Sequence, residues 1–454
     1  MDTVGAKNNL KIEVTNKQIL SIALPITISI LIPQLNMLIN SIFLGQVSKT
    51  ALGNAGITGV FYLIFAVAGS GLNNAIQSVF SKNAGSGNHQ KFTIILTQGI
   101  RIALQFAIIG ILFTWIVAPF IMRSVADAQS YPQEMYFLKI RILGLPFLYL
   151  FQMGNAFLIA SLNSKYLMIG FICEALVNVI FDYLLIFGHA GFPTMGFNGA
   201  AVASVIAEFT GVIVVLIVLH FSGIKNKYNL LKSFAFNKEI NTQILKISAP
   251  LVAQYVLSVT TWLVFFLLLE GRGENAKAIS NVMRNVFGLA GIFVWAFAST
   301  CNNMVSNLMG QSREAEILPA IKKITLWSIF FCTIPLILLN IFPNLFFTMF
   351  GQNKLFVAEG IAVIRMVSLG MLFMSIANVW LNGVTGTGKT KTNLAIEIVA
   401  ITFYLLYTLY FTKMHYISLA IAWSNEFVYW SITFIMSFLY LRSGKWKTKI
   451  MENE

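Results

Sequence analysis

The chain has 454 residues, of which 57% are apolar and only 11% are charged, and its mean hydropathy is +0.76. Soluble proteins carry about 25% charged residues, so the composition excludes a sizeable soluble domain and predicts an all-α membrane protein. The net charge of +14 falls in short loops between apolar runs. This is typical of membrane topology, and nucleic acid is therefore not expected as a partner.

About twelve runs are long enough to cross a bilayer, since a spanning helix needs about 20 apolar residues. In chain order we expect helices at 18–45, 51–80, 92–119, 133–161, 166–188, 197–222, 243–269, 276–308, 319–342, 355–383, 391–412 and 416–441. The predicted organisation is an N-terminal segment 1–17, an N-lobe 18–222 with helices one to six, a linker 223–242, a C-lobe 243–441 with helices seven to twelve, and a tail 442–454.

The charges in the loops predict the orientation. With an even number of helices both termini lie on one side, and that side holds nineteen Lys and Arg residues against six on the other. Cytoplasmic loops carry the excess of positive charge. We therefore expect a multi-pass protein of the plasma membrane with both termini in the cytoplasm.

The two halves of the chain share landmarks in the same order. The matching pairs are Pro25 and Pro250, Asn73-Asn74 and Asn302-Asn303, and NAFL at 155–158 and NVWL at 378–381. Their separations of 225, 229 and 223 positions are nearly one offset. Six-helix repeats that start on the same side are related by a pseudo-twofold axis along the membrane normal. The cleft between the lobes is then the expected substrate path.

The segment 174–211 resembles the fifth and sixth helices of the multidrug and toxic compound extrusion (MATE) family of secondary transporters. The family pattern is an Asn, an Asp four positions later, an apolar run ending in Gly, and then G-x-x-GAA-x-A-[ST]. Here it falls on Asn178, Asp182, Gly188, Gly196, Gly199, Ala200, Ala201, Ala203 and Ser204. The runs LPITISILIPQLNMLINSIFLG and NGVTGTGKTKTNL are also similar to the family's first helix and to its link after helix ten.

The resemblance implies twelve helices in two six-helix lobes and export of cationic or amphipathic organic compounds in exchange for H+ or Na+. It also implies an ion site in the N-lobe on helices one, five and six. One departure is Asn40, because the family commonly has an Asp five residues before the Gly that ends helix one. Other branches use acids in helices seven and ten. Here those helices carry only Glu270 and Glu359, near their ends, so a C-lobe ion site is not expected.

Acids inside the membrane are the sharpest functional signal, because a charge in hydrocarbon is costly. Only one Asp, Asp182, lies deep in a predicted helix, and it shares a face with Asn178 and Glu174 at spacings of four residues. Ser204 and Glu208 share a face of the next helix at matching depths. The pattern predicts one ion-coupling pocket, in which Glu208 replaces the carboxylate missing from helix one.

Four arginines within predicted helices leave alternatives open. Arg101 and Arg141 could pair with the buried acids and hold helices together. Arg284 and Arg365 lie in C-lobe helices, where they could bind an anionic substrate, stabilise the lobe, or snorkel to the membrane surface. The alternative function is therefore a flippase or exporter of a lipid-linked intermediate from the same superfamily.

Polar and aromatic side chains are candidates for the substrate cleft, since flat organic cations bind aromatic rings by cation–π contact. The candidates are Gln34, Tyr62, Tyr255, Trp262 and Trp295. The run Gly383–Thr390 matches the phosphate-loop pattern GxxxxGK[ST], but that loop follows a β-strand and here a spanning helix precedes it. The four His are scattered, so neither an enzyme nor a bound metal is expected. The expectation is a monomer in membrane lipid that uses neither ATP nor a cofactor other than the coupling ion.

Overall fold

The structure is a computed structural model that describes residues 10–125, 128–231, 234–270, 272–348, 354–413 and 417–447, and every regular element in these ranges is helical. The first half contains α1 Asn16–Val47, α2 Lys49–Gly85, α3 Lys91–Ile116, α5 Tyr131–Arg141 with α6 Leu145–Ala160, α7 Leu167–Phe187 and α8 Phe197–Phe221. The second half contains α10 Lys238–Glu270, α11 Glu274–Gly310, α12 Ile317–Ile341, α14 Lys354–Gly386, α15 Thr390–Lys413 and α16 Leu419–Ala422 with α17 Asn425–Arg442. Short helices lie in the links: α4 Ala118–Val125, α9 Ile224–Lys227 and α13 Pro343–Thr348.

The predicted spans correspond to these helices. Eleven helices of the described chain are long and apolar enough to cross a membrane, and the twelfth predicted span is the pair α16 and α17. Two details differ from the sequence expectation. The fourth span is broken at η1, Ile142–Gly144, and α10 begins inside the predicted linker, at Lys238. Most of the predicted segment 1–17 and of the tail 442–454 lies outside the described residues.

Helix ends follow local sequence signals. The side chain of Thr15 caps α1 by accepting a hydrogen bond from the main-chain N–H of Gln18 at 3.2 Å, and Ser48 caps α2 in the same way through Ala51 at 2.9 Å. At the other end of α7, Gly188 adopts a left-handed conformation with φ of 75°. Glycine takes this conformation without steric cost, so α7 stops here and the chain turns into α8.

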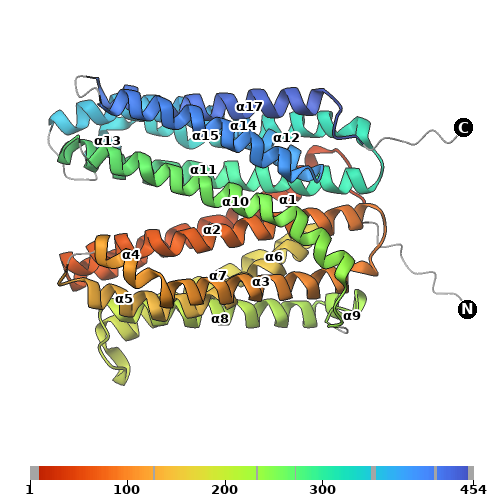
Figure 1. Cartoon of the computed structure of the whole chain (residues 1–454), viewed down its shortest axis with the longest axis horizontal. Helices are drawn as coiled ribbons and strands as arrows, with labels where there is room; N and C mark the ends of the chain where they lie inside the picture. The colour runs from red at the N-terminus through yellow and green to blue at the C-terminus, as the bar shows by residue number, and fades with distance from the viewer. Residues whose placement is uncertain are drawn as a thin grey trace, which may run out of the picture.

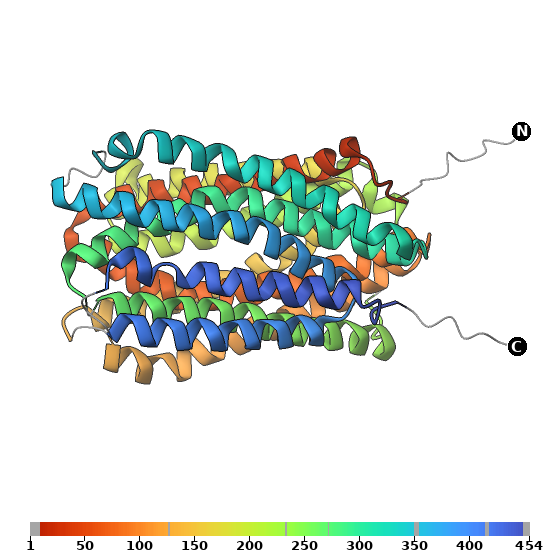
Figure 2. The same cartoon turned by 90° about the horizontal axis from the view of Figure 1, so that it is seen from above.

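The helices form two lobes, and the first helix of each lobe packs against both lobes. The elements α1 to α8 make one lobe and α10 to α17 the other, drawn from red to yellow-green and from green to blue (Figures 1 and 2). The first helix of each lobe packs against the second helix of the other, α1 on α11 and α10 on α2, and against the fifth helix of its own lobe, α7 or α15. This reciprocal packing confirms the predicted parallel repeat.

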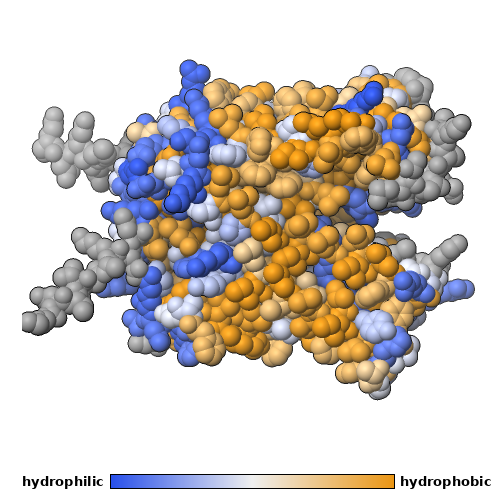
Figure 3. Space-filling model, turned by 180° about the vertical axis from the view of Figure 1, so that it is seen from behind, coloured by the Kyte–Doolittle hydropathy of each residue, from blue (hydrophilic) through white to orange (hydrophobic). Residues whose placement is uncertain are grey.

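The surface fits a bilayer. The start of α1, the end of α17 and α9 lie at one end of the bundle, called here the terminal end, and α4 and α13 lie at the opposite, far end (Figure 1). Hydrophilic residues gather toward the two ends, and hydrophobic residues cover the middle (Figure 3). Large apolar side chains near the middle of spanning helices are exposed, such as Phe209 on α8, Leu326 on α12 and Phe403 on α15. An exposed apolar area of this size is expected to face lipid.

The orientation can be tested by cysteine labelling. We expect cysteines placed at Lys82 and Lys389, both exposed at the terminal end, to be protected from an impermeant maleimide in intact cells. A cysteine at Ala190, exposed at the far end, should react. Tyr228 would be unsuitable because its side chain is buried. The opposite labelling pattern would place the termini outside.

The lobes meet through polar contacts between α2 and α11. The hydroxyls of Ser78 and Ser306 lie 2.8 Å apart, and Asn302 Nδ2 donates to Asn74 Oδ1 at 2.7 Å. Asn74 Nδ2 in turn donates to the hydroxyl of Tyr255 on α10 at 2.7 Å. Two of these residues, Asn74 and Asn302, are repeat landmarks. The duplicated Asn-Asn motif therefore holds the lobes together on the half toward the terminal end.

Two glycines allow the closest approach of the lobes. A Cβ added to Gly85 would overlap the main chain of Asn307, and one added to Gly310 would overlap that of Lys82. Both positions lie at the terminal end of α2 and α11. The main chains of the two lobes touch here only because neither glycine has a side chain.

We expect Gly310→Ala to disfavour this closed arrangement, because the added methyl group cannot fit against the main chain of the other lobe. Spin labels at positions 90 and 389, one on each lobe at the terminal end, should show a longer mean distance in the variant. Gly56→Ala is the matched control, since no atom lies within 4 Å of that position. An unchanged distance distribution in Gly310→Ala would contradict the tight packing.

Candidate ion-coupling site

Polar side chains face one another along the contact between α1 and α7. Asn36 Nδ2 on α1 donates a hydrogen bond to Asn178 Oδ1 on α7 at 2.5 Å. Asn40 and Asp182 lie one turn farther along the two helices, which run in the same direction. Residues four apart share a helix face, so both turns present their polar groups to the same seam. Asn178 and Asp182 are 4% and 0% exposed.

Most of the polar atoms on this seam have no partner. Both carboxylate oxygens of Asp182, Oδ1 of Asn40 and Oδ1 of Asn36 are buried without a hydrogen bond to any described residue. Buried polar groups are nearly always satisfied in folded proteins, so each exception calls for an explanation. Several vacant oxygens that converge from two helices are suited to a proton or a small hard cation. The residues present therefore fit the ion site expected on helices one and five.

Glu208 on α8 has a different role from the predicted one. Arg141 binds it with both nitrogens of the guanidinium, at 2.9 Å from Nη1 to Oε2 and 2.6 Å from Nη2 to Oε1. The Tyr62 hydroxyl donates to Oε1 at 3.0 Å, and the guanidinium lies 3.7 Å from the centre of the Tyr62 ring. Of the two alternatives left open by the sequence, the ion pair is therefore the one observed. Glu208 is already neutralised and does not stand in for an acid on α1.

The break in the fourth span positions Arg141. The residue ends α5, and the chain then passes through η1 before α6 begins. A Cβ added to Gly144 in this break would meet both Arg141 and Glu208, so a side chain at this position would displace the ion pair. Gly144 and the following Pro146 were visible in the sequence, but the long apolar run predicted one uninterrupted helix.

Glu174 on α7 interacts electrostatically with the same ion pair. Its Oε2 is buried without a hydrogen bond to any described residue and packs against α8 at Gly211, where a Cβ would come within 3.3 Å. Arg141 is the one described cation that interacts electrostatically with Glu174 and with Asp182. One guanidinium thus faces three carboxyl groups, including Glu208. The N-lobe can accept further positive charge.

The pocket predicted across α7 and α8 is only partly formed. Ser204 is half-buried. It makes no hydrogen bond to Asp182 or Asn178 in the described chain. The polar partners of α7 come from α1 instead. Asn36, which the sequence analysis overlooked, provides the direct contact; its spacing of four residues before Asn40 was the signal that could have identified it.

Comparison with known proteins agrees with this architecture. A family model described as MatE matches residues 25–184 and matches again at 250–409. The chain belongs to the MATE family. The two matches begin 225 positions apart, which is the separation of Pro25 and Pro250, so the duplication inferred from the landmarks is confirmed.

Individual relatives cover most of the chain at low identity. A probable multidrug resistance protein NorM of Thermotoga maritima is 21% identical over 95% of this chain and 93% of its own length. The multidrug resistance protein NorM of Vibrio vulnificus is 24% identical over 60% of each chain. An outward-facing MATE transporter structure superposes with a TM-score of 0.86 at 14% identity, covering 98% of both chains. A Pyrococcus furiosus transporter whose title reports reversed polarity of the binding pocket superposes with 0.87 at 15% identity, covering 99% and 100%.

The predicted cleft residues of this MATE protein fall into different environments. Gln34 on α1 meets α11 at Gly288, where a Cβ would lie 3.4 Å from its Oε1, and Tyr255 bonds to Asn74 across the lobes. Trp295 on α11 is 37% exposed. The other two do not line the interface: Tyr62 is bound within the N-lobe, and the Trp262 ring packs on Phe266 within the C-lobe, with centroids 4.5 Å apart.

The other three arginines singled out within the predicted helices make no ion pair with an acid in the described chain. Arg101 donates to the main-chain oxygen of Phe234 at 2.8 Å. Arg284 and Arg365 have exposed side chains, which is compatible with the alternatives of substrate binding and of snorkelling. Gly383, the first residue of the phosphate-loop pattern, belongs to α14, and a helical segment cannot wrap a phosphate.

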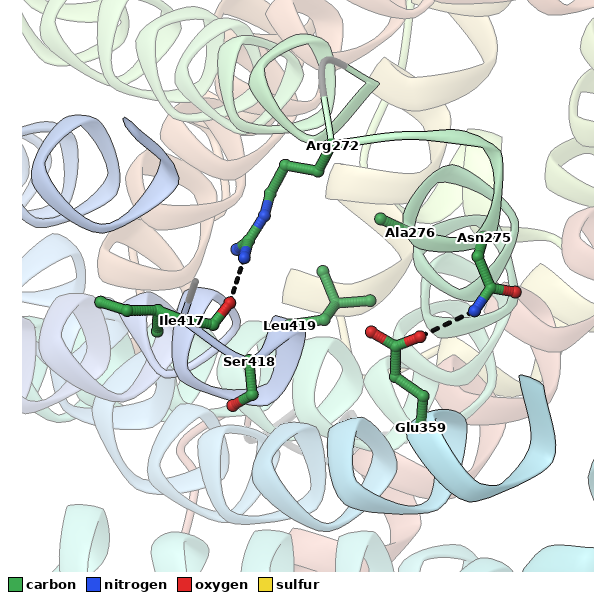
Figure 4. A pocket seen from close by; sticks show the side chains of 7 residues that line it. All are labelled: Arg272, Asn275, Ala276, Glu359, Ile417, Ser418 and Leu419. Carbon is green, nitrogen blue, oxygen red and sulfur yellow. Dashed lines mark hydrogen bonds between the residues drawn. The ribbon is translucent and has the colours of Figure 1, made fainter. Parts of the chain in front are cut away.

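A cavity of about 380 Å³ opens at the far end of the C-lobe of this MATE protein (Figure 4). Arg272 points across it to the main-chain oxygen of Ile417, and Asn275 Nδ2 donates to Glu359 Oε2 at 2.7 Å. All its lining residues come from the ends of C-lobe helices and the links between them. None of its lining residues belongs to α1 or α7, so the cavity is separate from the unpaired oxygens of the α1–α7 seam.

Proposed function

We propose that this chain is a secondary active antiporter that exports cationic or amphipathic organic compounds in exchange for H+ or Na+. The observation that carries the proposal is the buried carboxylate of Asp182, both of whose oxygens lack a partner in the described chain. The names of the NorM relatives, which refer to multidrug resistance, support an organic substrate. The plasma membrane, with cytoplasmic termini, is the proposed location.

The proposed coupling runs through α1. This helix contributes Asn36 and Asn40 to the ion site and packs against α11 of the other lobe, where Gln34 meets Gly288. A cation held between Asp182 and Asn40 would draw α1 toward α7. Because the same helix forms part of the lobe interface, occupancy of the site would change how the lobes fit together. Binding on one side of the membrane and release on the other then drives the exchange.

Either ion suits the residues present. A carboxyl group removed from water takes up a proton more readily, and protonation of Asp182 would satisfy one of its vacant oxygens. Carboxylate and amide oxygens are also hard ligands suited to a hard metal cation, and Asp182, Asn40 and Asn36 offer a set from two helices. The identity of the coupling ion is therefore the first property to determine.

The test is transport in proteoliposomes with an imposed proton or sodium gradient, using ethidium as a flat organic cation. We expect one gradient to accelerate dye movement and an ionophore that collapses this gradient to restore the rate of protein-free vesicles. Dye movement that neither gradient changes would contradict antiport.

A second candidate, transport of an anionic lipid-linked intermediate, is favoured by one observation. Arg284 is exposed and unpaired with any described acid, one turn from the point where α1 meets α11 at Gly288. Under the first proposal Arg284→Gln should leave ethidium transport in place. If the protein instead moves a fluorescent anionic lipid between leaflets and Arg284→Gln stops this movement, the second candidate holds.

A further inference from the structure

The C-lobe contains two buried carboxyl groups that the sequence analysis did not single out. Glu397 lies on α15 and is 0% exposed, and Glu426 lies in the first turn of α17 and is 3% exposed. Neither forms an ion pair with a described Lys, Arg or His. An unpaired charge at this depth is costly and marks a functional site by default. The rule that selected Asp182 applies equally to these two residues.

Glu397 is surrounded by neutral donors from two helices, α10 and α17. The Tyr429 hydroxyl donates to Oε1 at 2.5 Å, and Gln254 Nε2 donates to Oε2 at 3.2 Å. The Tyr429 and Ser258 hydroxyls lie 3.3 Å apart, and either can be the donor. A hydroxyl can donate or accept, so the Tyr429 hydroxyl can turn from Glu397 to Ser258 if the carboxyl gains a proton.

Glu426 has the same kind of environment. The Tyr404 hydroxyl donates to Oε1 at 3.3 Å and Trp430 Nε1 donates to Oε2 at 3.1 Å. The indole N–H of Trp262 also reaches this carboxyl. The rings of Tyr404 and Tyr429 are 5.8 Å apart, so the two carboxyl groups belong to one cluster between α10, α15 and α17.

No cation compensates the cluster from its neighbours. The titratable groups that face it are the phenols of Tyr255 on α10, Tyr404 on α15 and Tyr429 on α17. On α14, Gly370 lies against Glu426 and contributes no side chain. No described Lys, Arg or His is among the electrostatic partners of either acid.

We propose that Glu397 and Glu426 form a second cation site, in the C-lobe, whose ligand is the proton. The chemistry of the partners favours a proton over a metal ion. Indole N–H groups are donors only, so Trp430 and Trp262 cannot ligate a metal at Glu426, and among its bonded partners only the Tyr404 hydroxyl carries an oxygen. A proton needs no further ligands and removes the charge.

The position of the cluster links it to the repeat and to the lobe interface. Glu397 follows Glu174 by 223 positions, the offset that relates the runs at 155 and 378, and both residues lie on the fifth helix of their lobe. Gln254, which holds Glu397, precedes Tyr255, which bonds to Asn74 of the other lobe. The residue that binds Glu397 is thus the chain neighbour of a residue that contacts the other lobe.

The test is infrared difference spectroscopy of the purified full-length protein between low and high pH, without substrate. We expect a band from the C=O stretch of protonated buried carboxyl groups, part of which disappears in Glu397→Gln and another part in Glu426→Gln. Tyr429→Phe should shift the pH midpoint at which the Glu397 band changes and leave the pH midpoint of the Glu426 band unchanged. A merely structural role of Tyr429 would not shift one midpoint alone. Glu239→Gln, at an exposed position on α10, is the control.

Two results would overturn the proposal. If both Gln variants keep the full band, neither carboxyl titrates. If sodium at constant pH removes the Glu397 and Glu426 contributions, the site takes a metal ion. Both contributions should persist in Asp182→Asn, so this test is independent of the coupling proposed for the N-lobe.

Discussion

Asp182→Asn is expected to reduce gradient-driven transport to the rate of protein-free vesicles while the protein remains folded and inserted. The amide has nearly the shape of the carboxyl group but neither binds a proton nor carries a negative charge. In this chain the loss should be complete, because α1 has Asn40 in place of an acid and Glu208 is held by Arg141. The measurement is dye transport in proteoliposomes under the gradient that drives the unmodified protein.

Two comparisons make the Asp182 result interpretable. Elution as a single species from size-exclusion chromatography, with an unchanged melting temperature, should show that the variant is folded. Glu239→Gln, which removes an exposed acid at the start of α10, should keep the unmodified rate. Transport by Asp182→Asn at the unmodified rate would end the coupling proposal.

Arg141→Gln is expected to destabilise the N-lobe strongly. The variant would leave Glu208, 4% exposed, as an unpaired charge, and breaking a buried ion pair in this way costs about 3 to 5 kcal/mol. It would also remove the one guanidinium that faces Glu174 and Asp182. We expect a lower melting temperature in detergent, measured by the loss of monodisperse protein after heating.

A surface pair provides the contrast for Arg141. Arg313 and Glu316 form an ion pair whose side chains are 36% and 40% exposed, and such pairs contribute about 0 to 1 kcal/mol. Arg313→Gln should therefore change the melting temperature little. The double variant Arg141→Met with Glu208→Met should recover much of the stability lost in Arg141→Gln, because no buried charge remains. Equal melting temperatures for the two single variants would show that the Arg141 pair is not buried in the membrane.

Most of the fold was predictable from the sequence because the bilayer fixes the length of each helix. The expected span 18–45 is α1, Asn16–Val47, and the expected span 197–222 is α8, Phe197–Phe221. The lobe repeat was predictable from three landmarks, since duplicated segments keep residues that perform the same packing. The break at η1 was not predicted, because its signals, Gly144 and Pro146, lie inside a long apolar run that is typical of one uninterrupted helix.

For the candidate site, the sequence predicted which residues share a face of one helix but not which helices meet. The spacing of Asn178 and Asp182 placed them on one face, and the structure places that face against α1. Which arginine would pair with Glu208 depends on packing between helices, and the sequence could not choose between Arg101 and Arg141. Glu397 lies in the predicted span 391–412, but its burial depends on how α10 and α17 pack around α15, which the sequence does not specify.

The contacts between α2 and α11 have a consequence for how easily the lobes can separate. They include hydrogen bonds between hydroxyl and amide groups, such as the Ser78–Ser306 and Asn74–Asn302 pairs, beside apolar side chains of one core cluster that spans both lobes. Each such hydrogen bond contributes about 1 kcal/mol net, because water can replace the lost partner when the lobes part. Reversing a two-state population from 1:99 to 99:1 takes about 5.5 kcal/mol of differential binding. The polar contacts therefore account for only a small part of the free energy that ion binding must supply to separate the lobes, and the rest is set by the apolar side chains that the lobes bury against one another.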